Sequence, residues 1–137
     1  MISYGKRVLL VDDMKPVRQR LAEVLEENGF VVAQAQDGVQ ALWEMQLRHF
    51  DAVVTDDRMP RLNGLDLLTQ CRRTWPETPV VLFANLDWNR IELAEARGAF
   101  AWILKSSDSG VLLSMLALAL EQVVERRSVQ AIEQVGV

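Results

Sequence analysis

The sequence predicts an α/β fold, a doubly wound sheet of five parallel strands with helices on both faces, and three observations lead to it. Apolar runs that are too short for a helix occur five times along the 137 residues. Each run is followed by a segment whose apolar residues recur at helical spacing, and the connections are short. Such alternation calls for parallel strands joined by right-handed crossovers. The expected strand order is 2-1-3-4-5, one of two common orders, in a (βα)5 three-layer sandwich.

The first strand and the first helix have clear boundaries. Val8 to Val11 is a short aliphatic run that ends at Asp12-Asp13. Pro16 suits the first turn of the helix that follows, because an amide hydrogen has no helical partner at that position. Asn28-Gly29 then favours the end of the helix. We therefore expect a strand over residues 8–11 and a helix that opens at Lys15.

The next two strands repeat this pattern. Phe30 to Ala33 is the second strand, and Asp37 is placed to cap the amino end of the second helix. Ala52 to Val54 is a buried, β-branched third strand that leads into Thr55-Asp56-Asp57. Met59-Pro60 blocks continuation as a helix, and Asn63-Gly64 provides a turn that tolerates positive φ.

The second half of the chain completes the alternation. Its predicted elements are a helix over 65–73, a strand over 80–83 after Pro79, a helix capped by Asp87 that runs to Arg97 and stops at Gly98, a strand over 100–104, and a last helix capped by Ser107 or Asp108 that runs to about Glu125 or further.

Composition and charge limit the class of protein. The length suits one domain, and half of the residues are hydrophobic while a quarter are charged, as in ordinary globular proteins. A net charge of −4 argues against an electrostatic nucleic-acid binder. Cys71 has no partner for an internal disulfide and is expected to be a partly buried apolar residue. The sequence suggests neither a signal peptide nor a membrane span, so we expect a soluble cytoplasmic protein without a membrane partner.

Acidic residues and a lysine stand at the ends of three predicted strands. Asp12 and Asp13 follow the first strand, Asp56 follows the third, and Lys105 follows the fifth. In the order 2-1-3-4-5 the first and third strands are neighbours, and their carboxyl ends meet at the crevice where doubly wound sheets bind ligands. Converging carboxylates repel one another, and a hard divalent cation such as Mg²⁺ would offset that repulsion. Carboxylates, a cation and a lysine together suit the handling of a phosphoryl group.

The chain resembles the receiver domains of two-component response regulators over roughly residues 6 to 125. The matching segments are VLLVDD, AQDGVQAL, TDDRMPRLNG followed by LDLL, PVVLF and GAFAWILK. The most specific features, in this order, are the acidic pair, the Asp-x-x-Met-Pro-x-x-x-Gly spacing that starts at Asp56, and the strand-end lysine. The resemblance implies a flavodoxin-like fold and a signalling switch rather than a metabolic enzyme.

The resemblance also implies a role for each residue of the constellation. Asp56 would be the phosphoacceptor, because it lies three residues before Met59. Lys105 would bind the phosphoryl group, and the donor would be the phosphohistidine of a sensor histidine kinase or phosphotransfer protein. Chemistry would be limited to self-phosphorylation and self-dephosphorylation. The implied ligands of Mg²⁺ are Asp13, Asp56, the backbone carbonyl of Arg58 and, through a bound water, Asp12.

Three positions depart from the family pattern. Counted from Pro79, Ala84 stands where the family usually carries the Ser or Thr that binds the phosphoryl group, and alanine has no hydroxyl to donate. Asn85 substitutes for it only if the strand is offset by one residue. Trp102 stands at the position of the switch aromatic, usually Tyr or Phe, although plain packing accounts for it equally well. Ser106 replaces the usual proline. These departures favour an altered switch over an altered acceptor.

The last predicted helix is apolar around most of its circumference between Val111 and Leu120. A helix that flanks a sheet needs only one apolar face, so we expect the outer face to dock on a second copy. In the family the face made by the fourth helix, the fifth strand and the last helix often serves as a dimer or partner surface. A monomeric apolar helix is the alternative. Residues 1–125 are expected to form the receiver domain, and residues 126–137 a helical extension or tail.

Three functions compete for this sequence. The first is a receiver that accepts a phosphoryl group on Asp56 in a Mg²⁺-dependent reaction and relays it as a conformational or dimerisation switch. The alternative is a pseudo-receiver, an interaction module that works without phosphorylation; Ala84 and Ser106 favour it, and the intact Asp12, Asp13, Asp56 and Lys105 oppose it. An aspartate-based phosphohydrolase would need an Asp-x-Asp motif, which Asp56-Asp57-Arg58 does not supply. Asp57 itself is expected to be a solvated loop residue.

Overall fold

The fold is an α/β sandwich built on one parallel sheet. The computed structural model describes residues 4–135, and its five strands lie in the order β2-β1-β3-β4-β5, which confirms the predicted fold class. The strands are β1 (Arg7–Val11), β2 (Val31–Ala35), β3 (Ala52–Thr55), β4 (Val80–Ala84) and β5 (Ala101–Leu104). The helices are α1 (Lys15–Glu27), α2 (Gly38–Leu47), α3 (Gly64–Thr74), α4 (Trp88–Ala96) and α5 (Ser109–Val135).

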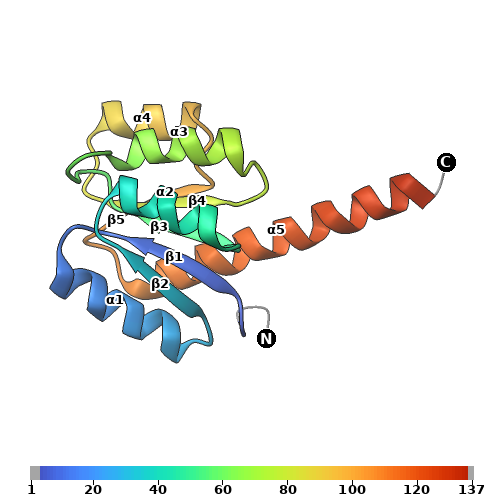
Figure 1. Cartoon of the computed structure of the whole chain (residues 1–137), viewed down its shortest axis with the longest axis horizontal. Helices are drawn as coiled ribbons and strands as arrows, with labels where there is room; N and C mark the ends of the chain where they lie inside the picture. Colours follow the sequence, from blue (N-terminus) through green and yellow to red (C-terminus); the bar gives the residue numbers. More distant parts are fainter. Residues whose placement is uncertain (1–3, 136–137) are drawn as a thin grey trace.

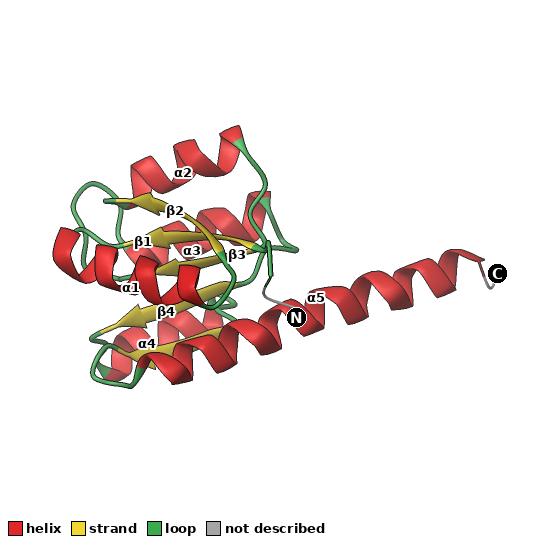
Figure 2. Ribbon diagram, turned by 90° about the horizontal axis from the view of Figure 1, so that it is seen from below, coloured by secondary structure: helices red, strands yellow, loops and turns green. Residues whose placement is uncertain are grey.

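Each face of the sheet has its own apolar core. Helices α1 and α5 cover one face, and α2, α3 and α4 cover the other (Figures 1 and 2). Successive strand residues point to opposite faces, so Leu10 packs in the first core while Leu9 and Val11 pack in the second. This explains why the strands read as continuous apolar runs. Cys71, predicted to be partly buried, is fully buried in the second core, where burial raises the pKa of its thiol to about 12.

Aspartate caps begin two of the helices as the sequence predicts. The side chain of Asp37 accepts a hydrogen bond from the amide of Gln40, at 2.8 Å, at the start of α2. Asp87 does the same for Arg90, at 2.9 Å, at the start of α4. Such a cap satisfies amides of the first turn that have no helical partner.

In the turn after β3 the positive φ falls on a residue that the sequence did not indicate. Asn63 has a φ of −77° and caps α3 through a 2.9 Å bond from the amide of Asp66, so Asn63-Gly64 does not use the positive φ that it tolerates. Arg61 instead adopts a φ of 68°, a left-handed conformation that is uncommon for a residue with a side chain. Gly64 is needed for a different reason: a Cβ at this position would collide with the carbonyl oxygen of Asp56.

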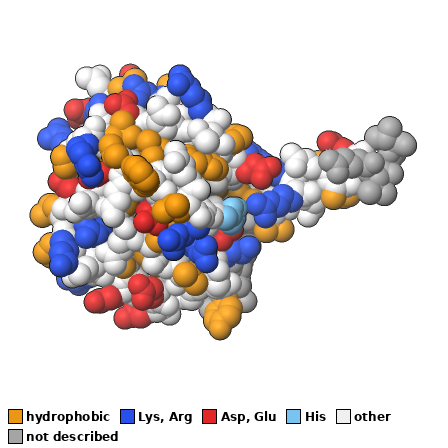
Figure 3. Space-filling model, in the orientation of Figure 1, with side chains coloured by type: hydrophobic (Ala, Val, Ile, Leu, Met, Phe, Trp, Pro, Cys, Tyr) orange, Lys and Arg blue, Asp and Glu red, His pale blue; other side chains and the backbone are white. Residues whose placement is uncertain are grey.

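Helix α5 continues as one helix to Val135, beyond the predicted end near Glu125. Its first half packs on the sheet through Leu112, Leu116 and Leu120, and its second half leaves the body of the domain (Figures 1 and 2). The projecting part carries both charged and apolar side chains (Figure 3), and Val129 and Ile132 are exposed on it. Across residues 4–135, none of the helices has both the length and the apolar character that crossing a bilayer requires.

Candidate functional site

Three carboxylates meet where β1 and β3 end. The two strands are paired with Val11 opposite Thr55, so the acidic residues that follow them emerge side by side. One carboxylate oxygen from each of Asp12, Asp13 and Asp56 lies within 4.8 Å of the others. Asp12 and Asp56 are 3% and 9% exposed, whereas Asp13 is open to solvent. The structure thus brings together the acidic residues that the sequence places at this edge of the sheet.

Lys105 reaches the same place from the end of β5. Its Nζ lies 2.9 Å from Oδ2 of Asp12 and 2.9 Å from Oδ2 of Asp56. Burial disfavours the charged ammonium, but the hydrogen bonds to the two carboxylates outweigh burial and raise the pKa of Lys105. Burial also raises the pKa of Asp56, against the opposing effect of the hydrogen bond from Lys105. Lysine therefore offsets part of the negative charge that the carboxylates concentrate here.

Backbone amides orient the two buried carboxylates. The amide of Asp57 donates to Oδ1 of Asp56 at 2.8 Å, which leaves Oδ2 facing Lys105. The amide of Met14 donates to Oδ1 of Asp12 at 2.9 Å, and the guanidinium of Arg18 donates to the backbone carbonyl of Asp12 at 2.7 Å. The two amide bonds thus orient the carboxylates of Asp56 and Asp12, and the Arg18 bond holds the backbone of Asp12.

The donor set fits a hard divalent cation. All three side chains present oxygen, the donor that Mg²⁺ prefers, and the exposed Asp13 leaves an approach for the waters that this ion retains. One ammonium group offsets only part of the repulsion among three carboxylates, so a bound cation would stabilise the cluster. Arg58 lies in the loop two residues after Asp56, with an exposed side chain. Its carbonyl as a further ligand stays a prediction.

Ala84 and Trp102 lie on the neighbouring strands. Ala84 ends β4 opposite Leu104 and is fully buried, and its carbonyl accepts a 3.2 Å bond from the amide of Lys105. This register leaves Asn85 exposed in the following loop. Trp102 is partly buried, and its indole Nε1 donates to Oε1 of Glu95 in α4 at 2.9 Å. Trp102 therefore contacts α4 rather than the acidic cluster.

Asp57 is not the solvated loop residue that the sequence suggested. It is 2% exposed, and its carboxylate accepts two hydrogen bonds from Arg90, Nε to Oδ2 at 2.8 Å and Nη2 to Oδ1 at 2.6 Å. The amide of Leu65 adds a third bond, at 3.2 Å. The ion pair raises the pKa of the Arg90 guanidinium, against the opposing effect of burial. Sequence reasoning missed this pair, because a second aspartate beside the acceptor reads as an ordinary loop residue.

A second arginine, Arg61, forms an ion pair with Asp37 close to Asp13 of the acidic cluster. Arg61 Nε and Nη2 lie 3.0 and 2.6 Å from Oδ2 of the buried Asp37, which joins the loop after β3 to the start of α2. Burial opposes ionisation of Asp37, but bonds from the amide of Gln40 and from Arg61 outweigh it and lower the pKa of Asp37. The ion pair also stabilises the left-handed backbone of Arg61, which no signal in the sequence announces.

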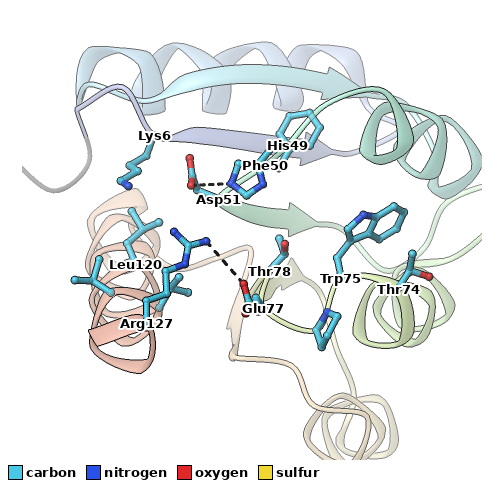
Figure 4. Close-up of a pocket in the computed structure, with 13 residues that line it drawn as sticks. Lys6, His49, Phe50, Asp51, Thr74, Trp75, Glu77, Thr78, Leu120 and Arg127 are labelled. Atoms are coloured by element: carbon cyan, nitrogen blue, oxygen red, sulfur yellow. Dashed lines mark hydrogen bonds and ion pairs between the residues drawn. The ribbon is translucent and has the colours of Figure 1, made fainter. Parts of the chain in front are cut away.

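A cleft of about 310 Å³ lies at the opposite edge of the sheet (Figure 4). Lys6, Asp51 and Thr78, which precede β1, β3 and β4, line it together with α5. His49 Nε2 lies 3.2 Å from Oδ1 of Asp51, and Arg127 lies 3.9 Å from Glu77. Open α/β sheets bind ligands at the carboxyl ends of their strands, and this cleft is at the amino ends. It is therefore separate from the acidic cluster.

Comparisons with known proteins agree with this geometry. The family model described as the response regulator receiver domain matches residues 8–117. Response regulator MprA of Mycobacterium sp. (strain KMS) is 43% identical over 81 residues, which are 59% of this chain and 35% of MprA. The chain thus spans about a third of the length of that relative.

Solved structures are similar over most of the chain. The signal receiver domain of an HD domain-containing protein from Pseudomonas fluorescens Pf-5 is 27% identical, with a TM-score of 0.85 over 93% of this chain and 96% of that one. Response regulator TrrA from Thermotoga maritima, solved in complex with Mg²⁺-BeF, is 27% identical, with a TM-score of 0.77 over 83% of this chain and 98% of that one.

These similarities decide between the competing functions. Receiver domains are signalling domains that bind Mg²⁺ at an acidic pocket and take a phosphoryl group from sensor kinases. A pseudo-receiver is not favoured, because the acidic cluster is complete and a structural neighbour holds Mg²⁺-BeF. Since the family model covers residues 8–117, more than half of the 137 residues, the chain belongs to the response regulator receiver domain family.

Proposed function

We propose that the chain works as a phosphoryl-accepting receiver in which Asp56 takes the phosphoryl group. The observation that carries this proposal is the setting of the Asp56 carboxylate. It is 9% exposed, shares its cluster with two further carboxylates, and has Lys105 Nζ 2.9 Å from its Oδ2. A nucleophilic carboxylate beside a cation site and a fixed ammonium is the arrangement that phosphoryl transfer to aspartate requires.

In the proposed reaction one oxygen of Asp56 attacks the phosphorus of a phosphohistidine. A new O–P bond forms while the N–P bond breaks, and the electron pair stays on the donor imidazole, which becomes protonated by water. Lys105 offsets the charge on the transferring oxygens. Mg²⁺, when bound, would neutralise charge on the same oxygens. Its proposed ligands are Asp13, Asp56, the backbone carbonyl of Arg58 and, through a water, Asp12.

The donor in this proposal is a sensor histidine kinase or a phosphotransfer protein. Hydrolysis of the aspartyl phosphate would return Asp56 to its starting form, so self-phosphorylation and self-dephosphorylation are the only proposed chemistry. A direct nucleic-acid partner is not proposed, since the chain has a net charge of −4.

Intact mass spectrometry tests this function with a small phosphodonor such as acetyl phosphate. We expect one phosphoryl increment in the presence of Mg²⁺, and none in Asp56→Asn or after removal of the metal. Lys105→Met should slow the reaction by roughly a hundredfold, as loss of one preorganised electrostatic contact does in enzymes. An increment that survives in Asp56→Asn would overturn the assignment.

A second proposal concerns assembly: the face formed by α4, β5 and α5 pairs with a second copy. Apolar side chains from all three elements are exposed on it. They are Trp88 and Leu93 on α4, Leu104 on β5, and Val111 and Leu118 on α5. Exposed apolar patches mark interaction sites. Residues 1–125 would form the receiver unit and residues 126–137 a helical extension of it, of which 136–137 lie outside the described residues.

Light scattering with and without beryllofluoride, a stable mimic of a phosphoryl group, tests the assembly. A dimer that forms or tightens with Mg²⁺ and beryllofluoride, and that Leu118→Glu abolishes, is the expected result. The matched control is Trp43→Glu, which removes an exposed apolar side chain (65%, against 49% for Leu118) from α2, outside the face formed by α4, β5 and α5. A monomer under all conditions, at high protein concentration, contradicts the proposal.

A further inference from the structure

Asp57 forms hydrogen bonds both with the carboxylate of Asp56 and with helix α4. Its backbone amide donates to Oδ1 of the acceptor Asp56 at 2.8 Å. Its carboxylate binds the guanidinium of Arg90 through two bonds of 2.8 and 2.6 Å. Through the hydrogen bonds of its amide and of its carboxylate, Asp57 therefore links the carboxylate of Asp56 to Arg90 in helix α4.

Both ends of this path are fixed. Arg90 lies in the first turn of α4, and its own amide donates to the capping side chain of Asp87 at 2.9 Å. Asp57 is anchored by the amide of Leu65 at 3.2 Å, at the start of α3. A bidentate guanidinium–carboxylate pair has strict angular requirements, and at 2% exposure of Asp57 water competes little for it. The pair thus ties the position of Asp57 to the first turn of α4.

Two further polar contacts lie at the carboxyl end of α4. Arg97 Nη1 is 3.0 Å from Oδ1 of Asp66, and Glu95 accepts the indole hydrogen bond of Trp102 at 2.9 Å. These contacts hold the carboxyl end of α4 against α3 and β5, away from the acidic cluster. At the strand end nearest to the amino end of α4, Ala84 offers no side-chain donor.

We propose that the Asp57–Arg90 pair couples the phosphorylation state of Asp56 to the position of α4, an inference that rests on the proposed function. A phosphoryl group carries about −1.5 to −2 charges at neutral pH, where a single carboxylate charge stood before. It also changes the oxygens available to the amide of Asp57. The added charge repels the Asp57 carboxylate, the loop shifts, and Arg90 moves with it, so the first turn of α4 takes a second position.

Amide hydrogen exchange, read by mass spectrometry on peptides from α4, tests the coupling alongside intact mass. In the unmodified chain, addition of Mg²⁺ and acetyl phosphate should change exchange in the first turn of α4. Coupling between two sites typically changes an equilibrium constant by about 5- to 150-fold, and we expect the amide exchange rates to change by a factor in this range. Arg90→Met should reach the same final phosphorylation and lose the exchange response, because Arg90 acts through Asp57 as a positioning residue.

Three further variants separate coupling from a merely structural role. Asp57→Asn should lose the same response, and the double variant Asp57→Asn/Arg90→Met should lose no more than either single one. Arg90→Lys keeps the positive charge but cannot form the two parallel hydrogen bonds of a guanidinium, so it should retain part of the exchange response of α4. Arg97→Met is the matched control, since it removes the other arginine–aspartate pair of α4, and should respond like the unmodified chain.

The outcomes distinguish the coupling from the function on which it rests. If the unmodified chain takes up no phosphoryl group, the proposed function and the coupling fall together. If all variants are phosphorylated and Arg90→Met keeps the full response of α4, or Arg97→Met loses it equally, the coupling alone is refuted. Should Arg90→Met prove unfolded by circular dichroism, Arg90→Lys and Asp57→Asn give the same decision.

Discussion

Removal of Arg90 should destabilise the fold by more than its partly exposed position suggests. Arg90→Met deletes two of the three hydrogen bonds to the Asp57 carboxylate and leaves that group, at 2% exposure, with the amide of Leu65 alone. Loss of one partner of a fully buried ion pair costs about 3–5 kcal/mol. Because the Arg90 side chain is 31% exposed, water can enter the vacated space. We therefore expect the free energy of unfolding to fall by about 2–3 kcal/mol.

Urea unfolding followed by circular dichroism measures this change. With slopes of about 1–3 kcal/mol per molar urea, the midpoint should fall by about 0.7–3 M. The double variant Asp57→Asn/Arg90→Met carries no stranded charge and should recover about half of the loss. Arg97→Met, which breaks the more exposed pair with Asp66, should cost about 0–1 kcal/mol. A cost for Arg90→Met no larger than that of Arg97→Met, or no recovery in the double variant, would refute the reasoning.

Three further predictions concern the loops around the site. Ala84→Ser should tighten binding of beryllofluoride by at least about tenfold, because a charge-assisted hydrogen bond contributes about 1.5–3 kcal/mol; titration calorimetry checks this, and unchanged affinity would show that position 84 does not face the ligand. The lowered pKa of Asp37 means that its pair with Arg61 stabilises the fold above the ordinary pKa of 3.8 and that this contribution disappears as the pH falls through the lower folded value. Asp37→Asn should therefore lower the free energy of unfolding at pH 7 and reduce its change with pH below about pH 4, as urea titrations measure. An unchanged pH dependence of the free energy of unfolding argues against the pair. Gly64→Ala should cost at least about 2 kcal/mol, since its Cβ would meet the carbonyl of Asp56 and lie 2.8 Å from Cα of Asp57, and a thermal shift near zero would contradict this packing.

Residues at strand ends were predictable because parallel strands present their carboxyl ends at one edge of the sheet. Asp12, Asp56 and Lys105 are far apart in the sequence, yet each directly follows an apolar run, and the topology brings them together. The caps formed by Asp37 and Asp87 were predictable for a local reason, since a capping side chain bonds an amide only a few residues away.

Pairs that depend on side-chain direction were not predictable. Arg90 lies 33 residues beyond Asp57, and the sequence gives no measure of how closely the first turn of α4 approaches the loop after β3. The left-handed φ of Arg61 follows from the tight return of that loop rather than from any preference of arginine. Helix α5 passes its expected end because Arg126-Arg127 interrupt the apolar spacing, and the few apolar residues beyond them, Val129 and Ile132, give only a weak periodic signal. In each case tertiary geometry decides what local pattern leaves open.

The most direct test of the account is to locate the phosphoryl group on the chain. After phosphorylation with Mg²⁺ and acetyl phosphate, reduction with borohydride converts an aspartyl phosphate to homoserine, which peptide mass spectrometry then places in the sequence. The account predicts homoserine at position 56 and unmodified aspartate at positions 12, 13 and 57. Homoserine at position 57 or 13, or none after demonstrated uptake of a phosphoryl group, would contradict the assignment of Asp56 as the acceptor.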